Sequence, residues 1–81
     1  MNTEIKIISV PQLRHLVDAG QSRFKVKLAP GISYKKEIIP AEHGGYIVTT
    51  FGNARVVTSE QLDSQSDIVL NQINKGRLWT A

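Results

Sequence analysis

An alternating stretch, residues 22–28, constrains the fold of this 81-residue chain more than any other feature. Apolar and cationic side chains take turns along it. The apolar set is Phe24, Val26 and Leu28, and the cationic set is Arg23, Lys25 and Lys27. Alternation with a period of two residues is typical of a β-strand with one buried and one exposed face. The sequence therefore predicts a sheet that is covered on one side and exposed to solvent on the other.

Five other stretches have the composition of strands, since they are rich in β-branched and aromatic residues and turn residues bound most of them. They are residues 4–9, 32–39, 46–51, 54–58 and 77–80. Gly52 and Asn53 separate two of these stretches. They predict a two-residue hairpin turn in which Phe51 pairs with Ala54.

Two helices are predicted from their caps and apolar stripes. The first begins at Ser9, whose side chain has capping-box spacing with the glutamine three residues later, and ends at Gly20. The second runs from Ser66 to Gly76, after a short helical turn over residues 58–62. The apolar stripes are Leu13, Leu16 and Val17 on the first helix, and Ile68, Val69 and Ile73 on the second.

Together these elements predict a single small α+β domain over residues 1–81, with a mainly antiparallel sheet and two helices packed on one face. Adjacent strands are close in sequence, which favours antiparallel pairing. The two apolar stripes need one shared surface, and the apolar side of residues 22–28 supplies it. We expect about four to six strands, the usual size of a sheet.

The composition is that of a soluble chain. Cysteine is absent, so neither disulfides nor thiolate metal sites help to hold the fold together, as in a reducing compartment. The first residues lack the basic start and apolar run of a signal peptide. No apolar stretch approaches the ~20 residues that cross a bilayer. We therefore expect a cytoplasmic protein with no membrane partner.

The sequence contains no motif for catalysis or metal binding. It has no Gly-x-Ser-x-Gly elbow and no phosphate-binding glycine loop, and Gly44-Gly45 leads into a strand and predicts a turn. His15 and His43 lie in different predicted elements, without the further ligands that a metal site needs. We therefore predict a protein that is not an enzyme, has no catalytic residue and uses no cofactor or metal.

Charge is segregated along the chain. The net charge is +3, from ten Lys and Arg against seven Asp and Glu. Between Asp18 and Glu37 there is no acid. This interval holds Arg23, Lys25, Lys27, Lys35 and Lys36, whereas the acids Glu60, Asp63 and Asp67 follow later. Such segregation gives the chain a basic and an acidic region.

The basic strand favours one class of function, nucleic-acid binding. Its three cations stand about 7 Å apart in succession, which suits contacts with successive phosphates. Tyr34 on the next strand would add a platform for an unpaired base. The residues of this hypothetical site are Arg23, Lys25, Lys27, Tyr34, Lys35 and Lys36. The competing interpretation is structural, because an exposed strand needs polar side chains and lysine discourages edge pairing.

A second class of function is binding to a larger protein, as an adaptor or inhibitor. Trp79, the only tryptophan, is a candidate partner contact if it is exposed at the C-terminal edge of the sheet. The acidic region near Glu60 would add charge complementarity. We predict protein binding as the function, with nucleic-acid binding through the basic strand as the alternative. The oligomeric state stays open.

Four pieces of the second half of the chain form a recognisable pattern. They are Ser33-Tyr34-Lys35-Lys36, the aromatic strand 46–51, Thr58-Ser59-Glu60-Gln61-Leu62, and Asp67-Ile68 followed by Gln72-Ile73-Asn74-Lys75-Gly76. In this pattern the chain resembles small uncharacterised proteins of bacteriophages and prophages. The resemblance implies an accessory protein of a mobile element and brings no known activity with it.

Overall fold

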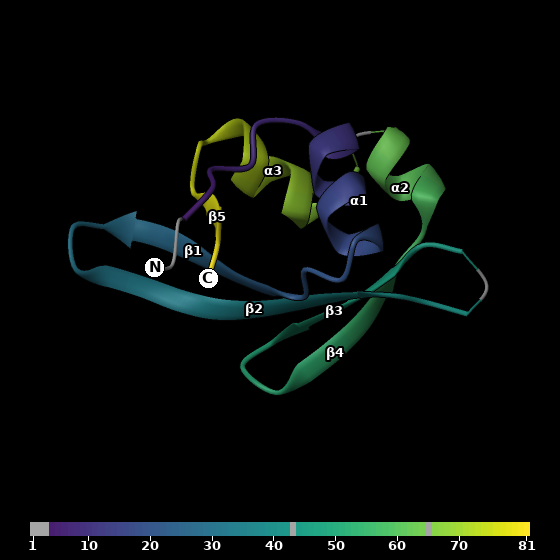
Figure 1. Cartoon of the computed structure of the whole chain (residues 1–81), viewed down its shortest axis with the longest axis horizontal. Helices are drawn as coiled ribbons and strands as arrows, with labels where there is room; N and C mark the ends of the chain where they lie inside the picture. Colours follow the sequence, from purple (N-terminus) through teal and green to yellow (C-terminus); the bar gives the residue numbers. More distant parts are fainter. Residues whose placement is uncertain (1–3, 43, 65) are drawn as a thin grey trace.

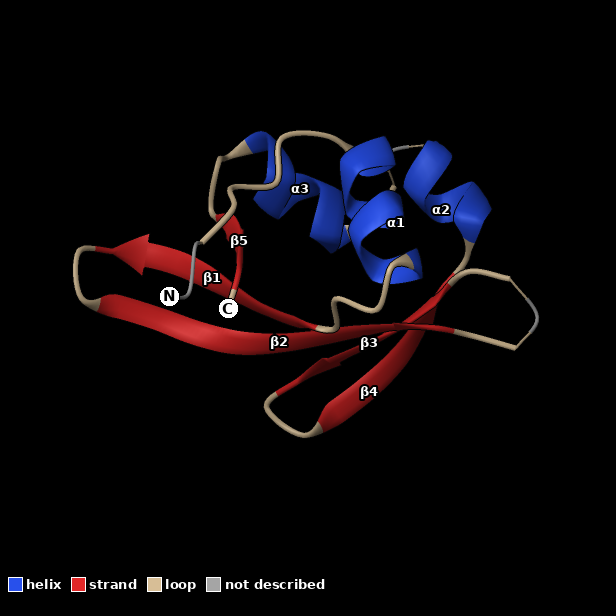
Figure 2. Ribbon diagram, in the orientation of Figure 1, coloured by secondary structure: helices blue, strands red, loops and turns tan. Residues whose placement is uncertain are grey.

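The computed structural model describes residues 4–42, 44–64 and 66–81. The elements in this part of the chain are α1 (Val10–Asp18), β1 (Arg23–Ala29), β2 (Ile32–Pro40), β3 (Tyr46–Thr50), β4 (Asn53–Val57), α2 (Ser59–Asp63), α3 (Ile68–Asn74) and β5 (Leu78–Thr80). The strands form one antiparallel sheet in the order β4-β3-β2-β1-β5. The helices lie together on one side of it (Figures 1 and 2). The predicted α+β fold is confirmed, and the short helix α2 lies on the same side of the sheet as the two longer helices.

The alternation that predicts β1 is visible in its burial. Phe24 and Val26 are almost fully buried against the helices, whereas Arg23 is exposed. Leu28 departs from the expected pattern, because 46% of its surface is exposed. The β1–β2 hairpin extends past the helices (Figure 1), so the apolar side of its tip has nothing to pack against. Ile32, on the other arm of this tip, is 59% exposed for the same reason.

The core lies between the sheet and the helices. The sheet contributes Phe24, Val26, Ile38, Tyr46, Val48, Val57 and Leu78, the helices contribute Leu13, Val17, Leu62, Val69, Leu70 and Ile73, and Ile7 comes from the N-terminal segment. Leu16, expected on the buried stripe of α1, is only partly buried at the margin of this cluster. A core this small depends on each of its members, since one domain of this size has only a few kcal/mol of stability to lose.

The first residue of each longer helix is set by a capping side chain that accepts a hydrogen bond from a backbone N–H of the first turn. Ser9 caps α1 as predicted, its Oγ accepting a hydrogen bond from the Gln12 N–H at 3.3 Å. The prediction that Ser66 begins the last helix is wrong by one residue. Asp67 caps α3, and its Oδ1 accepts a hydrogen bond from the Val69 N–H at 2.7 Å. A carboxylate is the stronger acceptor at a helix N-terminus, because it carries a full negative charge.

The N-terminal segment contributes less strand than predicted. Residues 4–9 form an isolated bridge between Lys6 and Trp79 instead of a continuous strand. Backbone hydrogen bonds still tie the segment to β5, from the Ile7 N–H to the Leu78 carbonyl and from the Thr80 N–H to the carbonyl of residue 5, both at 2.9 Å. The segment therefore covers the β5 edge of the sheet.

The β3–β4 turn lies one residue earlier than predicted. Its central residues are Phe51 and Gly52, with φ of 53° and 79°, so Thr50 pairs with Asn53. A two-residue turn of this hand needs positive φ at both centres, which is unusual for a phenylalanine. The Phe51 ring packs against Tyr34, with the ring centroids 5.1 Å apart, and this contact favours the observed register.

Candidate functional site

The open face of the sheet is the side opposite the helices. Lys25 alternates with the core residues of β1, so its side chain points to this face. Residues paired across an antiparallel sheet share a face. Lys25 pairs with Lys35 on β2 and with Trp79 on β5, and Trp79 pairs with Lys6. These four side chains therefore form one row across the open face.

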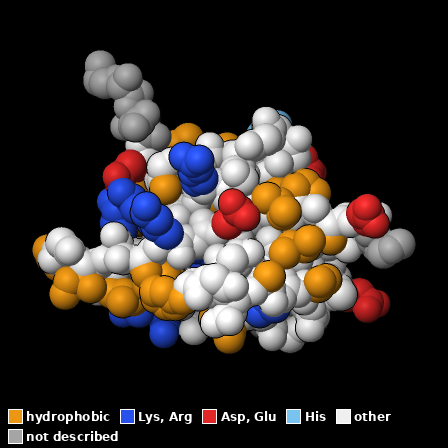
Figure 3. Space-filling view, turned by 90° about the horizontal axis from the view of Figure 1, so that it is seen from below, with side chains coloured by type: hydrophobic (Ala, Val, Ile, Leu, Met, Phe, Trp, Pro, Cys, Tyr) orange, Lys and Arg blue, Asp and Glu red, His pale blue; other side chains and the backbone are white. Residues whose placement is uncertain are grey.

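Two more cations lie on the same face, and a third lies beside it. Arg23 and Lys27 flank Lys25 at a spacing of two residues. Arg77 directly precedes β5, and its carbonyl accepts a hydrogen bond from the Lys27 N–H at 2.8 Å. We define the basic face as Trp79 with the six cations Lys6, Arg23, Lys25, Lys27, Lys35 and Arg77. Figure 3 shows charge gathered in this way, with Lys and Arg side chains clustered at the left of the view beside an acidic one.

Glu4 is the acid that neutralises part of the basic face. Its carboxylate accepts hydrogen bonds from the ammonium groups of both Lys25 and Lys27, the second at 2.7 Å. These bonds lower the pKa of Glu4 from 4.5 to about 2. Glu4 is therefore ionised throughout the neutral range, and it occupies the two lysines that a partner's anion would contact.

Trp79 is partly exposed on the basic face and is not a core residue. The Lys27 ammonium lies 3.9 Å from the centroid of its ring, which is a close cation–π contact. An indole that a neighbouring cation holds at the surface has lost much of its conformational freedom already in the unbound protein. Such preordered aromatic side chains are favourable contacts in protein interfaces.

Tyr34 and Lys36 do not join the other residues of the predicted basic site. Both alternate with Lys35, and they pair across the sheet with the buried Val26 and Phe24, so they point to the helix side. Lys36 is only 5% exposed, and the Tyr34 ring packs on the β3–β4 turn. The period of two residues that groups Arg23 with Lys25 also separates Tyr34 and Lys36 from Lys35, and this was readable in the sequence.

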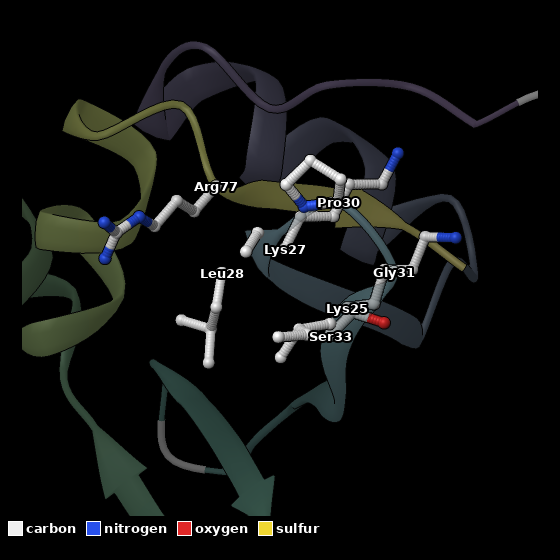
Figure 4. Close-up of a pocket in the computed structure, with 9 residues that line it drawn as sticks. Lys25, Lys27, Leu28, Pro30, Gly31, Ser33 and Arg77 are labelled. Atoms are coloured by element: carbon white, nitrogen blue, oxygen red, sulfur yellow. The ribbon is translucent and has the colours of Figure 1, made fainter.

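The tip of the β1–β2 hairpin lies beside the basic face. A hollow of about 560 Å³ here is bounded by aliphatic and cationic side chains together. Its lining includes Leu28, Pro30, Ile32, Lys25, Lys27 and Arg77. In Figure 4, Leu28 and Arg77 lie on one side of the hollow, and Lys25, Gly31 and Ser33 on the other. Arg77 was not identified from the sequence, because only the topology brings β5 next to β1.

Two acids of the acidic region have structural partners. Asp63 accepts a hydrogen bond from Arg14 at 2.7 Å and links α2 to α1. Asp67 accepts two hydrogen bonds from Arg55, at 2.5 and 3.1 Å, and links α3 to β4. Glu60 is exposed. These pairs leave the acidic region with less free charge than the sequence suggests.

Among residues 4–42, 44–64 and 66–81, no cluster of three or more histidine, cysteine or acidic side chains has the arrangement of a metal site. His15 is exposed on α1, and His43 lies outside the described residues. No helix in the described part of the chain has the length and apolarity to span a bilayer. Comparisons with protein-family models, curated proteins and solved structures gave no match to this chain.

Proposed function

We propose that this protein is a small non-enzymatic accessory protein that binds an acidic surface of a larger protein, as an adaptor or inhibitor. The observation that carries the proposal is the hollow at the hairpin tip, where exposed aliphatic side chains and cations of the basic face meet. Leu28 and Ile32 expose apolar surface that a partner would bury. The cations around them favour a partner with carboxylates next to its own apolar groups.

The mixture of side chains supports a protein partner over a nucleic acid. A phosphate backbone complements cations but offers nothing comparable for Leu28 and Ile32, whereas protein interfaces combine aliphatic, aromatic and Arg contacts. The aromatic platform expected from Tyr34 faces the other side of the sheet. The Trp79 ring is covered by Lys27, so a base would have to displace that contact in order to stack.

Nucleic-acid binding remains the second candidate, because one specific observation favours it. Six of the ten cations of the chain lie on or beside one face of the sheet. Among the described residues, strand pairing adds the acid Glu37 to this face and hydrogen bonds add Glu4. Proteins that hold single strands combine cations along the backbone with aromatic rings for stacking, and this face has the cations and one such ring, Trp79. In that case Arg23, Lys35 and Arg77 would contact phosphates.

We also propose the compartment in which the protein acts and its biological context. A chain without cysteine suits the reducing cytoplasm. The resemblance of residues 33–78 to small phage and prophage proteins supports an accessory role in a mobile element, acting on a protein of the host or of the element itself.

The test is capture from the native host on three immobilised proteins: the wild type, Ile32→Ser and Ile68→Ser. Ile68 on α3 is the matched control, since it is 60% exposed and Ile32 is 59% exposed. We expect the wild type and Ile68→Ser to retain one protein, identified by mass spectrometry, that Ile32→Ser loses. Equal retention by all three variants would contradict the proposal.

Fluorescence anisotropy with labelled oligonucleotides at 50 mM salt tests the second candidate in parallel. We expect no binding tighter than about 100 μM, which is the weak end of non-specific affinity. Binding to single strands that weakens with salt, at a log–log slope of about 0.7 per phosphate, would assign the basic face to nucleic acid instead.

A further inference from the structure

Lys36 is a buried lysine without a partner. It lies in the middle of β2, between Phe24 of β1 and Thr50 of β3, and only 5% of its surface is exposed. Among the described residues, none forms a hydrogen bond or ion pair with its ammonium group. Its closest aromatic contact is Tyr34, whose ring centroid lies 5.9 Å away. The Lys36 ammonium keeps some contact with water, while most of its side chain is buried. An anion bound there would pair with a charge that has lost part of its hydration.

The charges near Lys36 do not supply that anion. Burial lowers the pKa of Lys36, and the Arg55 guanidinium lowers it further, while the Asp67 carboxylate raises it. Asp67 is already hydrogen-bonded to Arg55 and to the Val69 N–H, so its acceptor sites are largely used. The cluster of Lys36, Arg55 and Asp67 therefore has one more positive charge than negative.

Lys36 lines an open hollow of about 870 Å³. The other lining side chains are aromatic or cationic to a large extent. They include Phe24, Tyr34, Phe51, Arg23 and Lys35, and the acid Glu37 lines the hollow as well. Phe51 and Tyr34 pack against each other at this hollow, and Phe51 is 77% exposed. The volume lies in the range of small-molecule sites, which combine an apolar lining with a few polar groups that fix orientation.

We propose that this hollow binds a small organic anion, a carboxylate on an aromatic or short alkyl body, with the carboxylate on Lys36 and the body against Tyr34 and Phe51. The carboxylate supplies the negative partner that the Lys36 ammonium lacks. The charge-assisted hydrogen bond between them is among the stronger ones available to a protein. The apolar body covers Phe51, which is otherwise largely exposed. Arg23 and Lys35 line both this hollow and the basic face, but Lys36, Tyr34 and Phe51 do not belong to the basic face. A test at Lys36 therefore stands or fails independently of the proposed protein partner.

The test uses benzoate as the probe, followed by amide chemical shifts of the labelled full chain. A ligand of this size binds in the millimolar range, so the titration extends to tens of millimolar at constant ionic strength. We expect saturable shifts at residues 34–36 and 50–52. Lys36→Met keeps the length of the side chain and removes its charge, and it should weaken binding about tenfold or more. Lys75→Met is the matched control, because Lys75 is exposed at the end of α3 and does not line the hollow, and it should bind as the wild type does.

Three outcomes would overturn the proposal. The first is equal binding of benzoate by Lys36→Met, and the second is equal binding of the uncharged benzyl alcohol by the wild type. The third is tighter binding of a blocked Phe-Asp dipeptide than of benzoate, which would assign the hollow to a carboxylate of a protein partner. If Lys36→Met does not fold, the pKa of Lys36 is followed by NMR in the wild type. Saturating benzoate should raise it by about one unit, which corresponds to a tenfold preference for the charged form, and an unchanged pKa would refute the site.

Discussion

Asp67 joins two elements through one carboxylate. Its side chain is 6% exposed, accepts two hydrogen bonds from Arg55 on β4, and caps α3 at the Val69 N–H. Burial alone raises the pKa of Asp67, but the hydrogen bonds from Arg55 and Val69 outweigh it and the pKa lies below its ordinary value. At the scale of single residues, this is the polar contact on which we expect stability to depend most.

Replacing Asp67 by Asn should destabilise the protein by about 1–3 kcal/mol at pH 7, because it removes a charged acceptor and leaves Arg55 without its partner. Urea unfolding followed by circular dichroism measures the change. The control is Asp63→Asn, since the Asp63 side chain is 62% exposed and its pair with Arg14 should contribute less than about 1 kcal/mol. Equal unfolding midpoints for Asp67→Asn and the wild type would contradict this role.

The same contact sets a pH dependence. The pKa of Asp67 is lower in the folded state than in the unfolded chain, where it is about 3.9. Its contribution is therefore complete above pH 5 and is lost as the pH falls through the folded-state value. The difference in stability between the wild type and Asp67→Asn should be constant from pH 5 to 8 and shrink below about pH 4.

At the scale of elements, the sequence predicts those helices and strands whose formation depends on a local residue pattern. The strand β1 follows from its alternation, and α1 follows from the Ser9 cap. The β3–β4 turn does not, because the Phe51 ring has a partner on β2 that the local sequence cannot identify. The N-terminal segment also differs, since its few hydrogen bonds depend on β5, which is far away in the sequence.

Burial predicts which of two apolar residues, Phe24 or Leu16, contributes more to the free energy of unfolding. Phe24 on β1 is 1% exposed and belongs to the core, whereas Leu16 on α1 only packs at its margin. We expect Phe24→Ala to destabilise the protein by about 3–5 kcal/mol and Leu16→Ala by less than half of that. Urea unfolding of both variants gives the comparison. A larger loss for Leu16→Ala would show that α1 packs differently from the structure.

At the scale of the whole molecule, most of the charge excess lies on the open face of one sheet. The sequence predicts that Arg23, Lys25 and Lys27 share a face, because that depends only on the strand period. It does not predict that Lys6 and Arg77 join them, since this requires β5 and the N-terminal segment to lie beside β1. It also predicts too many free cations, because Glu4 holds two of them.

The central claim is that the hairpin tip and the basic face together bind an acidic protein surface. The most direct measurement is the amide and indole NMR spectrum of the labelled protein while the captured partner is added in steps. We expect line broadening at residues 27–33 and at the Trp79 indole N–H, with the amides of α2 and α3 unchanged until saturation. Broadening confined to α2 and α3, with the hairpin tip and Trp79 unaffected, would contradict the claim.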